Sequence, residues 1–283
     1  MLNKIKSSSP IQFLDGVSNW ERRYMSKKLI FFDIDGTLYN EEKKLPQSAK
    51  EAIQQLKNQG HEVAIATGRS PFNITEIRKE LEIDNYVSFN GQYVVLNGQV
   101  IYKNPINISA LEELTNYSTK NQHPIVYLDH EDMKGNVESH TMLEEAVGSL
   151  SVSGKVGYDP LYHRDREIFQ SFLIYRDEDQ VDYKSAFPQL DFIRWHEYAV
   201  DVLPAGGSKA VGIQAAMNHF GIEPEHVYAF GDGLNDIEML SFVMNSVAMG
   251  NAHEKAKSAA KYVTKHVDED GIAYGLELVG LLK

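Results

Sequence analysis

Short apolar runs alternate with amphipathic stretches in the first part of the chain. Residues 29–32 and 63–66 are continuous apolar runs, and such runs predict buried strands of a parallel sheet. The stretch between them begins near Pro46, and its apolar residues recur at helical spacing: Ala49, Ala52, Ile53 and Leu56. A second helix is expected after Pro71. This β–α–β–α order predicts an α/β fold with a Rossmann-like, doubly wound parallel sheet.

The pattern changes at about residue 85. Residues 93–102 read as a hairpin whose Asn97-Gly98 pair suits a type I′ turn. The chain from Thr67 to Lys209 is far longer than the dozen or so residues that a parallel crossover needs. We therefore expect an inserted α+β domain with an antiparallel sheet. Its predicted strands are 124–128, 168–175 and 192–195, and its predicted helices are 111–121, 138–147 and 179–187.

Near the C-terminus, apolar runs and amphipathic stretches alternate again, as they do at the start of the chain. Ile213, Ala216 and Met217 share a helical face, and residues 227–230 form a third apolar run. The segment 246–249, a helix from about His253, a strand at 262–264 and a last helix from about Gly271 complete the expected core. The predicted domains are therefore a core of residues 25–84 and 198–283 and an inserted domain of residues 85–197.

Composition excludes several classes of protein. The net charge of −12 argues against binding to nucleic acid or to anionic membrane surfaces. No apolar stretch approaches the roughly 20 residues that span a bilayer. With no cysteine, disulfides and thiolate chemistry are ruled out, which suits a reducing cytoplasm. We expect a cytoplasmic monomer or weak homo-oligomer.

Two aspartates give the chain its clearest chemical signal. Asp33 and Asp35 directly follow the first apolar run, and Gly36 and Thr37 come next. Ligands of open α/β sheets bind at the carboxyl ends of the strands, where both carboxylates would lie. Two anions in one place need compensation, and a divalent cation with oxygen ligands can provide it.

Three later segments add complementary groups at other strand or helix ends. Thr67, Gly68 and Arg69 follow the second run; the hydroxyl, the close backbone approach at glycine and the guanidinium suit phosphate oxygens. Ser208 can cap a helix with Lys209 in its first turn. Asp232, Asn235 and Asp236 follow the third run and add two carboxylates and an amide.

This order of motifs resembles the haloacid dehalogenase (HAD) superfamily, and within it the Cof-type branch of phosphatases. Asp33 with Asp35, Thr67, Lys209, and Asp232 with Asp236 match its four motifs in turn. Asn90-Gly91, residues 248–252 and residues 269–273 resemble further signatures of that branch. The resemblance extends from about Met25 to the C-terminus. Asp201 departs from it, because a glutamate is usual there, and so does Ala210, where glycine is usual.

The resemblance implies a catalytic role for Asp33, Asp35, Thr67 and Lys209. Asp33 is the expected nucleophile, which forms an aspartyl-phosphate, and Asp35 is the expected general acid and base. Mg²⁺ is expected on the carboxylates of Asp33 and Asp232 and on the backbone carbonyl of Asp35. Asp236 is expected to orient Lys209 or a metal-bound water. The substrate-binding set is expected to be Thr67, Gly68, Lys209 and Asn235.

The expected function is a Mg²⁺-dependent phosphatase for a small phosphorylated metabolite, either a sugar phosphate or a phosphorylated cofactor. Two alternatives remain open: a phosphotransferase or phosphomutase with the same site, and a non-catalytic metabolite-binding or regulatory protein. The inserted domain is expected to act as a cap that selects the substrate. Its polar candidates are Asp129, His130, Arg164 and Arg194; a solvated surface position is the more common role for any one of them, and none is assigned to the substrate.

Residues 1–24 differ from the rest of the chain and read as a poorly ordered N-terminal extension. We predict that a variant that lacks them retains the phosphatase activity of the full chain, because every motif lies downstream of Met25. Comparing the specific activity of the two purified proteins tests this. A large loss of activity or of solubility would refute it.

Overall fold

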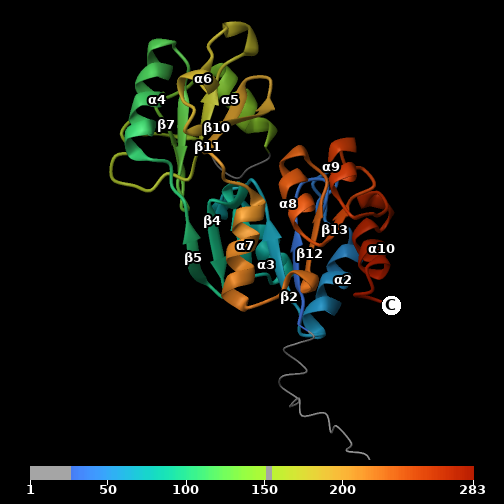
Figure 1. The fold of residues 1–283 in the computed structure, drawn as a ribbon. Coiled ribbons are helices and arrows are strands. Elements are labelled where there is room, and N and C mark those ends of the chain that lie inside the picture. The colour runs from blue at the N-terminus through green and yellow to red at the C-terminus, as the bar shows by residue number, and fades with distance from the viewer. Residues whose placement is uncertain (1–26, 151–154) are drawn as a thin grey trace, which may run out of the picture.

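The computed structural model describes residues 27–150 and 155–283, whose strands form two separate sheets. In Figure 1 the smaller sheet and its helices, coloured green to yellow, lie above the larger sheet. The expected N-terminal extension falls outside the described residues. None of the helices in the described part of the chain combines the length and the apolar character needed to cross a bilayer.

The larger sheet unites segments from both ends of the chain. Its strands from β14 to β3 are parallel, and β4 and β5 extend it as an antiparallel hairpin. In spatial order the eight strands are β14 (Tyr262–Val263), β13 (Asn245–Ala248), β12 (Val227–Gly231), β1 (Leu29–Phe32), β2 (Glu62–Ala66), β3 (Asn85–Ser88), β4 (Tyr93–Leu96) and β5 (Gln99–Lys103). This arrangement confirms the predicted α/β fold with a parallel sheet at its core.

Helices cover both faces of this sheet because alternate strand residues point to opposite sides. Ile30 and Phe32 belong to the apolar cluster that includes residues of α2 and α10, whereas Leu29 and Phe31 pack with residues of α7 and α8. The helices around the sheet are α2 (Gln47–Asn58), α3 (Thr75–Leu81), α7 (Lys209–Phe220), α8 (Ile237–Phe242), α9 (Glu254–Ala259) and α10 (Gly271–Leu278). The four apolar residues predicted for the first helix are all buried in α2.

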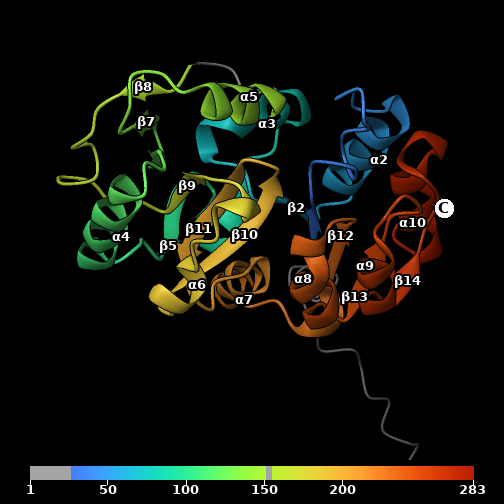
Figure 2. The same cartoon turned by 90° about the horizontal axis from the view of Figure 1, so that it is seen from above.

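The smaller sheet is mostly antiparallel; only β7 and β8 pair in parallel. In spatial order its strands are β10 (Leu190–His196), β11 (Ala199–Pro204), β9 (Gln170–Ile174), β6 (Ile125–Leu128), β7 (Met133–Gly135) and β8 (Gly157–Tyr158). Residues of α4 (Ile108–Lys120) and α6 (Tyr183–Ala186) pack against one of its faces, and residues of α5 (Thr141–Ser149) against the other. Figure 2, which looks from above onto the smaller unit, shows β9, β11 and β10 side by side. The strands β7, β8 and β11 were not predicted as part of this sheet.

Sheet pairing shifts the expected domain boundaries. Residues 85–103 were expected in the inserted domain, but β3, β4 and β5 are hydrogen-bonded into the larger sheet. Similarly, β11 was expected in the core, yet it lies between β10 and β9. A period of two predicts a strand without saying which sheet it joins, so the sequence could not decide this. We propose that the inserted unit begins after Lys103 and ends after Pro204.

The hairpin of β4 and β5 has the predicted turn. Asn97 and Gly98 both have positive φ, 51° and 73°, as a type I′ turn requires. The hairpin also helps to join the two units: Tyr93 of β4 packs edge-on against Phe169, with ring centroids 4.9 Å apart. Phe169 also stacks on Phe89 at 5.7 Å. An aromatic cluster therefore connects the two sheets.

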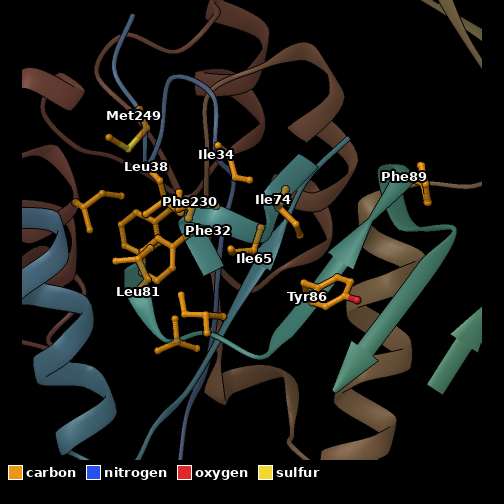
Figure 3. Close-up of a cluster of buried hydrophobic side chains, with 14 of the residues drawn as sticks. Phe32, Ile34, Leu38, Ile65, Ile74, Leu81, Tyr86, Phe89, Phe230 and Met249 are labelled. Atoms are coloured by element: carbon orange, nitrogen blue, oxygen red, sulfur yellow. The ribbon is translucent and has the colours of Figure 1, made fainter. Parts of the chain in front are cut away.

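Stacked phenylalanines of β1 and β12 lie at the centre of the larger unit. The rings of Phe32 and Phe230 are 5.0 Å apart, and both side chains are fully buried. Figure 3 shows them among Ile34, Leu38 and Ile65. Both residues come just before the aspartate-bearing loops, so this packing fixes the strand ends from which the candidate site is built.

We predict that Phe230→Ala lowers the free energy of unfolding by about 3–5 kcal/mol, because it removes a buried ring and leaves a cavity. Urea denaturation followed by circular dichroism measures the change. Phe242→Ala is the matched control, since Phe242 is 41% exposed and should change stability far less. Equal losses in the two variants would show that the buried ring of Phe230 contributes no more to stability than the exposed ring of Phe242.

Candidate active site

Parallel pairing brings three loop segments to one edge of the larger sheet. The backbone N–H of Asp33 donates to the carbonyl of Phe230 at 3.0 Å, and that of Thr67 donates to Val87 at 2.9 Å. These bonds continue the strand ladders for one residue beyond β1 and β2. Asp232 follows the end of β12 in the same way. The predicted convergence of Asp33, Thr67 and Asp232 is thus built into the sheet.

Lys209 joins two of the acidic segments. Its Nζ donates to Oδ1 of Asp33 and to Oδ1 of Asp236, both at 2.6 Å, and its side chain is 0% exposed. Burial lowers the pKa of Lys209, but the two carboxylates outweigh burial and hold it above its ordinary value. The lysine therefore remains an ammonium ion. Residues separated by most of the chain meet here, as the motif order predicted.

The close approach of two backbones positions this lysine. Gly91 has a φ of +102°, and a Cβ atom there would lie 1.9 Å from the carbonyl oxygen of Ser208. Only glycine lets the segment after β3 pack against the start of α7. Ser208 is the N-cap residue of α7, but its side chain makes no capping hydrogen bond, so that part of the prediction is wrong.

Both carboxylate oxygens of Asp236 already have partners. Oδ1 accepts from Lys209, and Oδ2 accepts from the backbone N–H groups of Asp232 and Gly233 at 2.9 Å each. Asp236 is also 0% exposed. This arrangement suits a side chain that orients Lys209 and the loop after β12 more than it suits a direct metal ligand.

Asp33, Asp232 and Asp236 form a compact acidic cluster. One carboxylate oxygen from each lies within 4.8 Å of the others. Burial raises the pKa of Asp33 well above its usual range, against the opposing effect of Lys209, and burial together with Asp236 raises that of Asp232 to about 7. Three carboxylates face one ammonium ion, so the site has excess negative charge. Hard oxygen donors with uncompensated charge fit a divalent cation such as Mg²⁺.

The loop that carries Asp35 reaches Asp232 through Gly36 and Thr37. Gly36 has a φ of +79°, and a Cβ atom there would lie 2.2 Å from Oδ2 of Asp232. The Thr37 hydroxyl donates to Oδ1 of Asp232 at 3.1 Å. Asn251, from one of the C-terminal signatures, donates to the carbonyl of Gly36 at 2.7 Å. These contacts explain why glycine follows the second aspartate.

Asp35 lies nearer the surface and is paired with two cations. Arg69 donates to both of its carboxylate oxygens, at 2.8 and 2.7 Å, and Lys43 donates to Oδ1 at 2.7 Å. Burial raises the pKa of Asp35, but the hydrogen bonds and charges of Arg69 and Lys43 outweigh it and hold the pKa below its ordinary value. Arg69 was expected to face phosphate, and here it binds Asp35. Lys43 was not predicted, because nothing in its sequence context ties it to the motif.

Thr67, Gly68 and Asn235 lie next to Asn90, whose backbone N–H donates to the carbonyl of Thr67 at 3.0 Å. The Thr67 hydroxyl accepts the N–H of Arg69 at 3.1 Å, and the Asn235 amide donates to Oδ1 of Asn90 at 3.2 Å. A Cβ atom at Gly68 would approach the Asn90 amide to 3.0 Å. These three of the four predicted binding residues therefore belong to one polar network, and the fourth, Lys209, lies in the acidic cluster.

A cavity of about 230 Å³ opens between the two sheets at this point. The larger unit lines it with Asp33, Asp35, Lys43, Thr67, Gly68, Arg69, Ser70, Asn73 and Asn235. The smaller unit lines it with Leu128, Ser149, Leu150, Gln170, Phe172, Trp195 and Asp201. A larger cavity of about 520 Å³, beside the C-terminal end of α7, is lined by none of the predicted site residues. We therefore place the candidate active site in the smaller cavity.

The polar residues suggested for the inserted unit do not line this cavity. Asp129 is buried against Tyr162 and Arg166, and Arg194 donates to backbone carbonyls and pairs with Asp177. Of the residues that line it instead, Gln170 lies within the predicted strand 168–175, whereas Asp201 lies in β11, which was not predicted. Only the register of the sheet shows that they share a face.

Comparisons with known proteins agree with this geometry. A model of the haloacid dehalogenase-like hydrolases matches residues 30–276. The protein named "Putative phosphatase YkrA" of Bacillus subtilis is 47% identical over 92% of this chain and all of its own length. The crystal structure of a hypothetical protein from Geobacillus kaustophilus is 50% identical, with a TM-score of 0.87 over 90% of this chain and all of that one. A HAD subclass IIB sugar phosphatase is 31% identical, with a TM-score of 0.80 over the same shares of the two chains.

We predict that Asp201→Asn weakens the pH dependence of stability in metal-free protein. Burial raises the pKa of Asp201 to about 8, against the opposing effect of Gln170 and Trp195. A raised carboxyl pKa stabilises the fold fully below the unfolded value and loses that effect as pH rises through about 8. The free energy of unfolding, measured by urea denaturation, should decrease between pH 5 and pH 8.5. This decrease should be smaller in Asp201→Asn than in the wild type, by on the order of 1 kcal/mol after solvent screening.

Asp165→Asn serves as the control for this measurement, because Asp165 is an exposed aspartate of the same unit. It should follow the wild-type profile. An Asp201→Asn profile that also matches the wild type would show that the carboxyl of Asp201 is not protonated in the fold at pH 5.

Proposed function

Because this chain belongs to the haloacid dehalogenase-like hydrolases, we propose that it is a Mg²⁺-dependent phosphatase that acts on a small phosphorylated metabolite through an aspartyl-phosphate. The observation that carries this proposal is the buried ammonium of Lys209 between Asp33 and Asp236, beside Asp232. A structural relative is named a sugar phosphatase, and a relative from Bacillus subtilis is named a 5-amino-6-(5-phospho-D-ribitylamino)uracil phosphatase. A sugar phosphate or a phosphorylated cofactor is thus the favoured substrate. The lack of cysteine suits a reducing compartment, and we place the activity in the cytoplasm.

Asp33 is the proposed nucleophile. One of its oxygens accepts from Lys209, which leaves the second oxygen to form a bond to phosphorus as the ester P–O bond breaks. Lys209 balances the charge of the Asp33 carboxylate and can also reach a phosphate oxygen. The aspartyl-phosphate is then hydrolysed by water, which releases inorganic phosphate and restores the carboxylate.

Asp35 is the proposed proton carrier. It lines the same cavity as Asp33 and lies at its more exposed side. For the first half of the reaction Asp35 must take up a proton, which becomes possible if the substrate phosphate draws Arg69 or Lys43 away from it; it would then donate that proton to the leaving oxygen, and in the second half it would accept one from the attacking water. The cationic pair of Arg69 and Lys43 holds its side chain at the cavity wall.

The remaining groups would bind phosphate oxygens and the metal. The Thr67 hydroxyl, the backbone at Gly68 and the Asn235 amide are the proposed phosphate contacts, beside Lys209. Asp33, Asp232 and the backbone carbonyl of Asp35 would hold Mg²⁺, with Asp236 behind them. Bound Mg²⁺ would supply positive charge that neutralises the transferring phosphoryl group.

We predict that Asp33→Asn abolishes phosphate release while the fold persists, because the amide cannot form the acyl phosphate. A panel of phosphorylated metabolites, assayed for inorganic phosphate with and without Mg²⁺, provides the measurement. Wild-type activity should require the metal and no added acceptor. Turnover that persists in Asp33→Asn would remove the covalent mechanism, and phosphate release only with a second sugar present would point to a phosphotransferase.

We predict that Asp35→Asn lowers the rate by about 10²–10⁴-fold, the usual contribution of a positioned acid or base. The loss should be smaller for 4-nitrophenyl phosphate than for an alkyl phosphate, because nitrophenolate leaves without needing a proton. Comparing kcat for the two esters in the variant and the wild type tests this role. Equal losses for both esters would assign Asp35 to positioning instead of proton transfer.

A further inference from the structure

Two short connections join the smaller unit to the larger one. The first runs from the end of β5 to the start of α4. In it, the backbone N–H of Asn104 donates to the carbonyl of Gln92, in the larger unit, at 2.8 Å. Two residues later, the N–H of Ile106 donates to the carbonyl of Ile168, in the smaller unit, at 2.7 Å. The chain therefore passes from one unit to the other at Pro105.

The second connection runs from the end of β11 to the start of α7 and changes partners over an equally short distance. The N–H of Gly206 donates to Oδ2 of Asp191, in β10, at 2.8 Å. Gly207 packs against the larger unit instead, because a Cβ atom there would lie 1.8 Å from Nε2 of Gln92. The crossing thus lies at Gly206, which has a φ of +75° and open space where a Cβ atom would be. Lys209 follows three residues later.

Gln92 contacts both connections with one side chain. Its Oε1 accepts from Nδ2 of Asn104 at 2.7 Å, and its Nε2 lies against the backbone of Gly207. The residue is only 1% exposed, so water does not loosen these contacts. Gly91, its neighbour in sequence, packs against the carbonyl of Ser208. Gly91 and Gln92 together therefore hold the stretch of chain that leads into α7.

The amide nitrogen of Gln92 is buried without an acceptor. Within the described part of the chain, Nε2 forms no hydrogen bond, although the oxygen of the same amide is paired. Buried polar groups are nearly always paired, and an acceptor that reaches Nε2 in a second arrangement of the chain would explain this donor. The second connection lies against it and can turn at Gly206, since glycine adopts a wider range of φ and ψ than other residues. Such a turn would bring a backbone carbonyl toward Nε2 and would move the smaller unit with it.

The candidate active site lies between the two units that these connections join. Asp33 lines the cavity from the larger unit, and Trp195 lines it from the smaller one. A substrate in the cavity touches both units, so it favours the arrangement in which both contact it best. A hydrogen bond from Gln92 to the second connection would stabilise that arrangement.

We propose that Gln92 is a positioning residue of the active site. Its Oε1 holds the first connection through Asn104, and its Nε2 donates to a backbone carbonyl of residues 205–207 when substrate is bound. This bond fixes the smaller unit over the cavity and keeps the start of α7, and with it Lys209, in place beside Asp33. Gln92 is not among the described residues that line the cavity, so it acts without touching the substrate. The inference rests on the proposed phosphatase function and adds a residue to it.

Four variants test this role. Gln92→Met keeps the length of the side chain and removes both hydrogen-bonding groups. Gly206→Ala restricts the turn of the second connection, because alanine tolerates positive φ poorly. Gly60→Ala is the matched control: Gly60 has a φ of +84°, equally open surroundings and a place after α2, outside both connections. The fourth variant combines Gln92→Met with Gly206→Ala.

We expect kcat/KM for 4-nitrophenyl phosphate, measured with Mg²⁺, to fall about 3–10-fold in Gln92→Met, the effect of one lost hydrogen bond. It should fall by a similar factor in Gly206→Ala, whereas Gly60→Ala should match the wild type although it loses as much stability in urea. The double variant should lose little more than either single variant, because both changes block the same step. The factors should be the same for glycerol 3-phosphate, since Gln92 does not touch the leaving group.

The fluorescence of Trp195 provides a readout that does not depend on turnover. The chain has two tryptophans, and Trp20→Phe leaves Trp195, in the cavity wall of the smaller unit, as the sole one. In that background, Mg²⁺ with orthovanadate, a phosphate mimic, should change the emission of Trp195. The change should be far smaller after Gln92→Met or Gly206→Ala and unaltered after Gly60→Ala.

Four results would overturn the inference. Gln92→Met, shown to be folded by urea denaturation, could keep the wild-type kcat/KM and the wild-type Trp195 response. Gly206→Ala and Gly60→Ala could lose activity equally, which would assign the loss to backbone strain. The losses of Gln92→Met and Gly206→Ala could add up in the double variant, which would show two separate effects. The emission of Trp195 could also stay constant while orthovanadate inhibits turnover.

A wild type that hydrolyses no ester in the presence of Mg²⁺ would instead refute the proposed phosphatase function. The response of Trp195 to orthovanadate would then still decide the role of Gln92.

Discussion

The ion pairs of Lys209 are the interaction on which the rest of the site depends. A fully buried ammonium is costly unless anions and hydrogen bonds compensate it, and here Asp33 and Asp236 both lie at 2.6 Å. Each group is tied to a different element: Lys209 begins α7, Asp33 directly follows β1, and Asp236 follows β12. The ammonium therefore joins the two halves of the core that the inserted unit separates in sequence.

The same pairing leaves the site with an excess of negative charge. One ammonium faces three carboxylates, and burial raises the pKa of Asp33 and Asp232 in the absence of a metal. Asp236 has no oxygen to spare, since backbone N–H groups and Lys209 occupy both. The imbalance therefore falls on Asp33 and Asp232, beside the loop of Gly36, and it is the physical reason for proposing a divalent cation there.

The two units divide the chemistry between them. The larger sheet supplies the charged groups at its strand ends, where the backbone is held by hydrogen bonds to neighbouring strands. The smaller sheet supplies one apolar face interrupted by Gln170 and Asp201. The aromatic contacts of Phe169 with Phe89 and Tyr93 hold this face over the strand ends. The charged strand ends and the cavity wall that faces them can therefore vary independently, because they belong to different sheets.

The sequence by itself determined the strands that end in Asp33, Thr67 and Asp232, the buried face of α2 and the type I′ turn at Asn97-Gly98. These features are local: apolar runs, helical spacing and turn residues each act over a few positions. Tertiary structure alone decided that β4 and β5 extend the larger sheet, that Arg69 and Lys43 bind Asp35, and that Gln170 and Asp201 face the cavity. The strand order, the Arg69–Asp35 contact and the shared cavity face depend on which segments meet across long stretches of chain, and strand periodicity carries no information about the partner. Lys43 is only eight residues from Asp35, but their contact depends on how the loop between them folds.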